Sequence, residues 1–118
     1  MSRQLLIIAH APSPNTFRLV EALLRGARHP DIDNVIVTWK PPLEAGPEDV
    51  LSADAIILGT TENLGYMSGA LKDFFDRTYY PVLDKKQGMP CALLIRAGHD
   101  GTGTRRALDS ILTGLHWK

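Results

Sequence analysis

QLLIIAHAPSPNT, residues 4–16, passes from an apolar run directly into a segment rich in proline and small polar residues. The run at residues 4–9 shows no alternation of polar and apolar side chains, which is typical of a strand buried on both faces of a sheet. Residues 10–16 predict a loop, and Phe17, Val20 and Leu23 then recur at helical spacing. A buried strand followed by a helix is the first half of a parallel βαβ unit.

The same order of elements recurs along the rest of the chain. Further strands are predicted at residues 34–39, 54–60 and 90–95, helices at residues 17–27, 68–80 and 105–115, and one or two helical turns at 47–52. Pro81 is expected to end the second long helix. The alternation predicts an α/β fold in three layers, with a parallel sheet covered by helices on both faces.

Composition fits one ordinary globular domain over residues 1–118, with 44% hydrophobic and 22% charged residues. Lys plus Arg equals Asp plus Glu at 13 each, which argues against a nucleic-acid or membrane-surface binder. The single cysteine, Cys91, excludes an internal disulfide and is expected to be a small core residue. The use of one cysteine leads us to expect a reducing, cytoplasmic setting, and the first apolar run is too short for a signal peptide.

Three loops follow the carboxyl ends of predicted strands, at residues 10–16, 60–67 and 97–104. Each is rich in Gly, Ser, Thr, Asn or Pro. In open parallel sheets, ligands bind beyond the carboxyl ends of the strands, at the point where the strand order reverses. We therefore expect a ligand site to be built from these loops.

The first loop leads into a helix N-terminus, where free backbone N–H groups and the helix dipole favour a phosphate. Ser13, Asn15 and Thr16 add side-chain donors, and the loop contains no Lys or Arg. Binding would then be neutral cradling and not ion pairing. The alternative is plain helix capping by the same residue types. The loop is neither a Walker loop nor a Gly-x-Gly-x-x-Gly dinucleotide turn.

The second loop contains Gly65, which permits positive φ and close backbone approach to a flat ligand. Tyr66 and Met67 follow it and could pack against an aromatic ring. The alternative is a strand-to-helix connection in which Tyr66 and Met67 fill the core and Ser68 caps the helix.

The third loop, AGHDGTGT at residues 97–104, carries three glycines. They suit either close approach to a ligand or a flexible connector with Thr102 or Thr104 as the helix cap. His99 could donate a proton or could simply be solvated. The four histidines are not spaced as metal ligands, so we expect no metal site, and we assign no catalytic acid or base.

Together the three segments resemble the flavodoxin-like superfamily, especially its NAD(P)H-dependent FMN reductase branch. LIIAHAPSPNT at residues 6–16 resembles the strand and phosphate loop of that family. TENLGYMSGALKDFFDR at residues 61–77 resembles its Pro-Glu-Tyr-Asn segment, followed by Gly-Ala-Leu-Lys and a later Asp. AGHDGTG at residues 97–103 resembles the loop over the far edge of the flavin. Asn63 and Leu64 replace the Tyr-Asn of the reductases.

The resemblance implies a flavodoxin-like sheet of order 2-1-3-4, FMN as cofactor, and NADPH or NADH as co-substrate of an oxidoreductase acting on flavin, quinone or a similar small acceptor. Flavodoxin is itself the standard example of FMN at this switch point. The residues implied in cofactor binding are His10, Ser13, Pro14, Asn15, Thr16, Thr60, Thr61, Asn63, Leu64, Gly65, Tyr66, Met67, Ala97, Gly98, His99 and Gly101.

Two other functions remain open: a one-electron carrier of the flavodoxin type, and a flavodoxin-like module that has lost flavin binding. The family pattern continues with a fifth strand and helix beyond Leu115, whereas this sequence stops at Lys118. Right-handed crossovers would then leave the first helix alone on its face, beside an open apolar edge at residues 91–95. We expect either a fragment or a chain that forms a homodimer or a higher oligomer.

Overall fold

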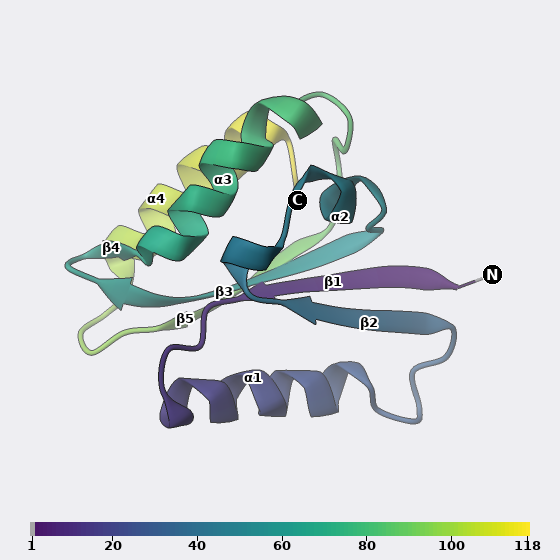
Figure 1. Cartoon of the computed structure of the whole chain (residues 1–118), viewed down its shortest axis with the longest axis horizontal. Coiled ribbons are helices and arrows are strands. Elements are labelled where there is room, and N and C mark those ends of the chain that lie inside the picture. Colours follow the sequence, from purple (N-terminus) through teal and green to yellow (C-terminus); the bar gives the residue numbers. More distant parts are fainter. Residues whose placement is uncertain (1) are drawn as a thin grey trace.

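A sheet with helices on both sides forms the centre of the computed structural model, which describes residues 2–118 (Figure 1). In chain order the elements are β1 (Arg3–Ala9), α1 (Pro14–Ala27), β2 (Val35–Lys40), the 3₁₀ turn η1 (Pro42–Glu44), α2 (Pro47–Leu51), β3 (Ala55–Asn63), β4 (Tyr66–Met67), α3 (Gly69–Val82), β5 (Cys91–Arg96) and α4 (Thr102–Leu115).

The four long strands run parallel in the order β2-β1-β3-β5. Leu5 of β1 pairs with Val37 of β2 and with Ala55 of β3, and Leu58 of β3 pairs with Leu93 of β5. The fourth strand in sequence, β4, is a short antiparallel addition to the end of β3. The predicted order 2-1-3-4 is therefore confirmed for the four strands that the sequence indicated.

The helices divide unequally between the two faces of the sheet: α1 covers one face, and α2, α3 and α4 cover the other (Figure 1). This follows from right-handed crossovers, because the first steps outward to β2 and the later ones step the opposite way. Successive side chains of β1 point to opposite faces of the sheet and so pack in two separate hydrophobic cores. Ile7 packs with Val20 under α1, whereas Ile8 packs with Phe74 and Leu108 under α3 and α4.

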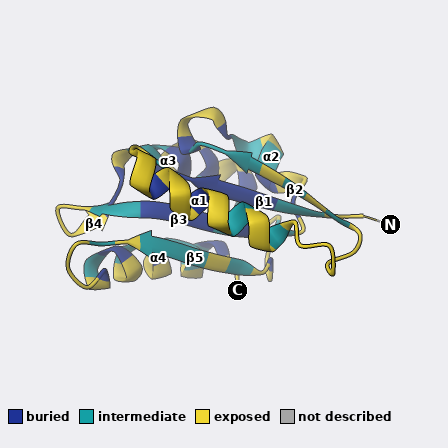
Figure 2. Cartoon of the chain, turned by 90° about the horizontal axis from the view of Figure 1, so that it is seen from below, coloured by how far each residue is buried: buried dark blue, intermediate teal, exposed yellow. Residues whose placement is uncertain are grey.

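The face under α1 is incompletely covered beside β5, as expected. Ala92 is exposed and Leu94 is half-buried, and Leu19 of α1, which lines a hollow together with Leu94, is 40% exposed. Figure 2 shows α1 as mostly exposed, in front of β1 and β3, which are mainly buried or half-buried.

The outer edge of β5 is covered at its beginning by the backbone of Lys118. Its N–H donates to the carbonyl oxygen of Met89 at 2.8 Å, and its own carbonyl accepts from the N–H of Cys91 at 2.9 Å. Cys91 is half-buried, and burial raises the pKa of its thiol to about 11. The thiol therefore stays protonated at neutral pH, consistent with a packing role.

Three helix boundaries differ from the sequence prediction. Helix α1 begins at Pro14 and not at Phe17, because Ser13 caps it and proline suits the first helical position. Helix α3 continues past Pro81 to Val82, because a proline in the last turn removes only one of the final backbone hydrogen bonds. Helix α4 begins at Thr102 and not at Arg105. Its start is set by Gly101, whose φ of 73° turns the chain into the helix, a conformation that glycine adopts without strain.

Candidate functional site

All three predicted loops lie at one edge of the sheet, where β1, β3 and β5 end, on the left in Figure 1. A small hollow at this edge is lined by residues from the first two loops and from the end of β5. Its lining comprises Ala9, His10, Thr16, Leu19, Val20, Gly59, Thr60, Thr61, Leu94 and Arg96. The structure thus brings the first and second loops together, as the parallel topology predicts.

The first loop ends in a reciprocal capping box. Ser13 is the N-cap of α1, and its Oγ accepts from the Thr16 N–H at 3.2 Å. The Thr16 Oγ1 in turn accepts from the Ser13 N–H at 3.0 Å. The capping interpretation therefore holds for this pair, and the buried Thr16 hydroxyl is committed to the helix start.

Exposed polar groups remain on the same helix start. Ser13, Pro14 and Asn15 are exposed, and Pro14 occupies the first helical position, where a missing N–H costs nothing. The Asn15 Oδ1 accepts from the Arg18 guanidinium at 3.1 Å, so the amide NH₂ of Asn15 can still donate to another group. Ser13 and Asn15 can therefore present donors to an anion.

Arg96 is a functional candidate that the sequence reasoning missed. The first loop itself contains no cation, but the sheet places the end of β5 beside it, so Arg96 lines the same hollow as His10 and Thr16. The available signal was a basic residue at the carboxyl end of a strand that neighbours β3. Only the strand order shows which loop that residue meets.

The second loop is largely a β-hairpin, and the prediction of a loop over residues 60–67 is wrong in this respect. Strand β3 continues to Asn63, which pairs with Tyr66 of β4. The two turn residues, Leu64 and Gly65, have φ of 53° and 77°. Positive φ at both positions is the type I′ geometry that matches the twist of a hairpin.

Side chains of the hairpin divide between the core and solvent. Met67 is only 2% exposed and belongs to the main core, as the alternative interpretation held, so its side chain is not available to a ligand. Leu64 is fully exposed and Tyr66 is 39% exposed. Asn63 is exposed, and its Oδ1 accepts from the Thr61 hydroxyl at 3.0 Å. The accessible part of the hairpin is thus the turn and its flanks.

Thr60 and Ser68 join the hairpin to α3. The buried Thr60 hydroxyl accepts from the Ser68 N–H at 2.9 Å, and Ser68 caps α3 by accepting from the Leu71 N–H at 3.2 Å. Thr60 therefore has a structural role for its side chain, and only its backbone remains available to a ligand at this edge.

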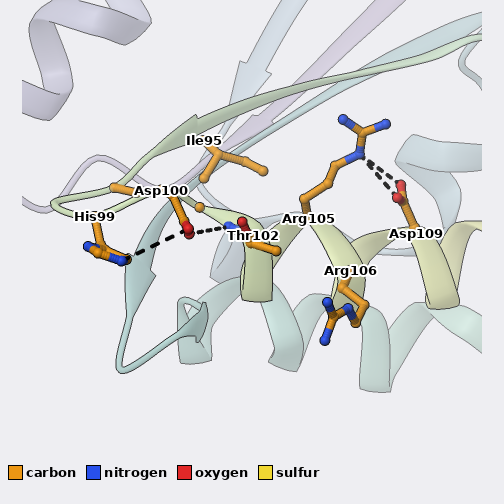
Figure 3. Close-up of a pocket in the computed structure, with 9 residues that line it drawn as sticks. Ile95, His99, Asp100, Thr102, Arg105, Arg106 and Asp109 are labelled. Carbon is orange, nitrogen blue, oxygen red and sulfur yellow. Dashed lines mark hydrogen bonds and ion pairs between the residues drawn. The ribbon is translucent and has the colours of Figure 1, made fainter.

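The third loop borders a separate open groove along α4 (Figure 3). The groove is lined by Ile95, Ala97, His99, Asp100, Gly101, Thr102, Arg105, Arg106 and Asp109. The His99 imidazole is largely exposed. Asp100 accepts from the Thr102 N–H at 2.9 Å, and that hydrogen bond lowers the pKa of the carboxyl. Ala97, His99 and Gly101 thus face a different hollow from that of the first loop, and Gly98 is exposed beside them.

The second and third loops meet directly at the start of α4. The Glu62 carboxylate accepts from the Thr104 hydroxyl at 2.8 Å and from the Thr104 N–H at 3.3 Å. A Cβ added at Gly103 would lie 2.2 Å from the Gly65 carbonyl oxygen. The sequence reasoning missed Glu62, because nothing local shows that an acid in one loop faces the helix start of another.

Within residues 2–118 there is no group of three or more His, Cys, Asp or Glu side chains placed to hold a metal ion. None of the helices in this part of the chain combines the length and apolar character needed to cross a membrane.

These features define a flavodoxin-like α/β protein, and comparison with solved structures agrees. A WrbA-like flavodoxin from Agrobacterium tumefaciens superposes with a TM-score of 0.74 at 21% identity, covering 98% of this chain and 75% of that one. An azoreductase from Bacillus anthracis str. Sterne gives 0.72 at 15% identity, covering 100% and 83%. At these identities the likeness establishes the fold alone.

Residues 9–118 match the NADPH-dependent FMN reductase family, and the chain belongs to that family. A flavodoxin from Aquifex aeolicus (strain VF5) is 32% identical over 112 residues, which cover 95% of this chain. The chain spans 60% of the length of that relative.

His10 carries a pH-dependent prediction. Burial lowers the pKa of its imidazole from 6.5, so the folded protein binds this proton less readily than the unfolded chain. We expect stability to fall as the pH drops below 6.5, because the unfolded state is then favoured by proton uptake. His10→Asn should reduce this loss. Urea denaturation of both proteins at several pH values checks it, and equal pH dependence in the two would contradict it.

Proposed function

We propose that this chain binds FMN at the edge formed by its three loops and acts as an NAD(P)H-dependent oxidoreductase on a small acceptor such as a flavin or quinone. The observation that carries the proposal is that an exposed helix start and an exposed hairpin turn lie at the same edge of the sheet, where parallel strands end. Membership of the FMN reductase family supports the choice of FMN over other phosphorylated ligands.

The helix start fits the phosphate end of FMN. Ser13 and Asn15 present exposed donors at the N-terminus of α1, where the helix dipole also favours negative charge. Arg96, across the shared hollow, supplies a positive charge that the first loop lacks. Phosphate recognition would therefore combine hydrogen bonding with one cation from a neighbouring strand.

The hairpin and the third loop fit the ring end. The Leu64–Gly65 turn and Tyr66 offer exposed backbone and an aromatic face, and Gly98 and His99 are exposed in the loop between β5 and α4. When bound, FMN supplies the electron and hydride chemistry, while the protein supplies position and electrostatics. None of the described side chains is assigned as a catalytic acid or base.

A one-electron carrier is the second candidate, and the similarity to the Aquifex aeolicus flavodoxin favours it. Anaerobic mixing of the FMN-loaded chain with NADPH or NADH separates the two functions. If the chain is a reductase, NADPH or NADH should bleach the flavin absorbance as soon as the two are mixed. Added quinone should then cause steady consumption of the nucleotide. A carrier is reduced by dithionite but not by either nucleotide.

We also propose that the chain forms a homodimer through the incompletely covered face beside α1. Ala92 and Leu94 of β5 and the exposed Leu19 of α1, which lines a hollow together with Leu94, make that face apolar. Sedimentation velocity should show a dimer at micromolar concentration. A monomer that melts cooperatively would contradict the proposal, and Leu19→Glu should shift a true dimer toward monomer.

A further inference from the structure

The β3–β4 hairpin contacts α4 through Glu62, a residue that would support the flavin-binding edge without itself touching the flavin. We propose that Glu62 is a positioning residue, which fixes the hairpin on α4 so that the Leu64–Gly65 turn is already in place before FMN arrives. The inference rests on the proposed function for its consequence, whereas the contact itself can be tested without flavin.

Both strands of the hairpin are anchored, β4 in the main core and β3 at the first turn of α4. Glu62 and Met67 pair with each other across the hairpin. Met67 is buried in the main core, so it holds β4. Glu62 lies on the same face of the hairpin as Met67, and its carboxylate accepts from the hydroxyl and N–H of Thr104 in the first turn of α4. A short two-stranded hairpin is marginal by itself, so its fixed position depends on these two anchors.

The carboxylate is well placed for a strong contact. It accepts two hydrogen bonds, at 2.8 and 3.3 Å, and it lies at a helix N-terminus, where the dipole favours negative charge. Glu62 is half-buried and Thr104 is fully buried, which limits competition from water. The contact therefore joins the second loop to the third.

Gly103 lets the turn come close to the helix. The Gly65 carbonyl oxygen occupies the space that a Cβ at Gly103 would need, 2.2 Å from its position. The atom nearest to this position belongs to the backbone of Gly65. A larger residue at position 103 could therefore not be accommodated by a change of side-chain rotamer. The two contacts together set the position of the Gly65 peptide relative to α4.

Hydrogen exchange on the full flavin-free chain tests the anchor directly. Glu62→Ala should raise the exchange rates of the hairpin amides at residues 63–67 roughly 10- to 100-fold, the loss expected for a hydrogen bond to a charged group. Amides of β1 serve as an internal reference for global stability. Glu62→Gln keeps an acceptor oxygen and should restore most of the protection, and Thr104→Val should give a smaller increase than Glu62→Ala.

Asp100→Ala is the matched control. The Asp100 carboxylate accepts from the Thr102 N–H in the first turn of the same helix, and this hydrogen bond does not involve the hairpin. It should raise exchange in the first turn of α4 and leave the hairpin amides unchanged. FMN affinity should fall with Glu62→Ala and recover with Glu62→Gln, in parallel with hairpin protection.

Unchanged hairpin exchange in Glu62→Ala would overturn the inference, as would an equal increase in Asp100→Ala, since Glu62 would then be only a helix cap. If the wild-type chain fails to bind FMN, the proposed function is refuted and Glu62 has no flavin to position. The exchange data then show separately whether the anchor holds the hairpin.

Discussion

Gly103→Ala is expected to displace the β3–β4 hairpin and to weaken both FMN binding and the fold. The new methyl group would lie 2.2 Å from the Gly65 carbonyl oxygen, closer than any packed contact allows. Because the opposing atom is backbone, the hairpin or the start of α4 must shift. Overpacking of this kind costs about 1–3 kcal/mol. Isothermal titration with FMN and denaturant unfolding measure the two effects.

Gly69→Ala provides the control for Gly103→Ala. Gly69 also lies in the first turn of a helix at the same edge, but a Cβ there has nothing within 4 Å. Since alanine is a better helix former than glycine, this variant should bind FMN normally and be at least as stable as the wild type. Normal FMN affinity in Gly103→Ala would show that the hairpin turn does not form part of the site.

Asn15→Ala is expected to weaken FMN binding roughly 10- to 100-fold while leaving riboflavin binding unchanged, since a hydrogen bond to a charged group contributes about 1.5–3 kcal/mol. Asn15 is exposed, and its side-chain hydrogen bond is to the Arg18 guanidinium. Its removal should therefore cost little stability. Riboflavin lacks the phosphate, so the comparison isolates that group. Fluorescence titration with each ligand measures both affinities.

Thr16→Val should behave differently from Asn15→Ala. The Thr16 hydroxyl is committed to the capping box with Ser13, so its loss should destabilise α1 by about 1 kcal/mol. Both ligands should then be weakened through the altered helix start. Equal weakening of FMN and riboflavin by Asn15→Ala as well would mean that the phosphate does not lie at this helix.

The long parallel strands could be predicted because their residues carry the signal locally. Residues 4–9 are apolar on both faces, and the strand they predict is buried between α1 and the other helices. The distribution of helices followed from right-handed crossovers together with the strand order that the family resemblance implies. Local signals failed at helix ends, where a tertiary contact also contributes: α4 starts three residues early, after Gly101 at positive φ, with Asp100 and the distant Glu62 accepting from its first N–H groups. Pro81 is accommodated in the last turn of α3.

The site was only partly predictable for the same reason. The positions of the loops follow from topology, but β4 has two residues, too few for any strand pattern. Met67 was placed beside a ligand because it follows a glycine-containing turn, yet the hairpin directs it into the core. Arg96 and Glu62 lie far in sequence from the residues they meet. Such pairings require the folded structure.

Titration of the full chain with FMN tests the central claim most directly. The account predicts saturable quenching of FMN fluorescence with one flavin per chain, because the ring would lie against the hairpin turn and Tyr66. FAD should show no advantage, since the first loop lacks a dinucleotide fingerprint. A chain that is folded by circular dichroism and leaves the fluorescence of FMN unchanged at high micromolar concentration would contradict the account.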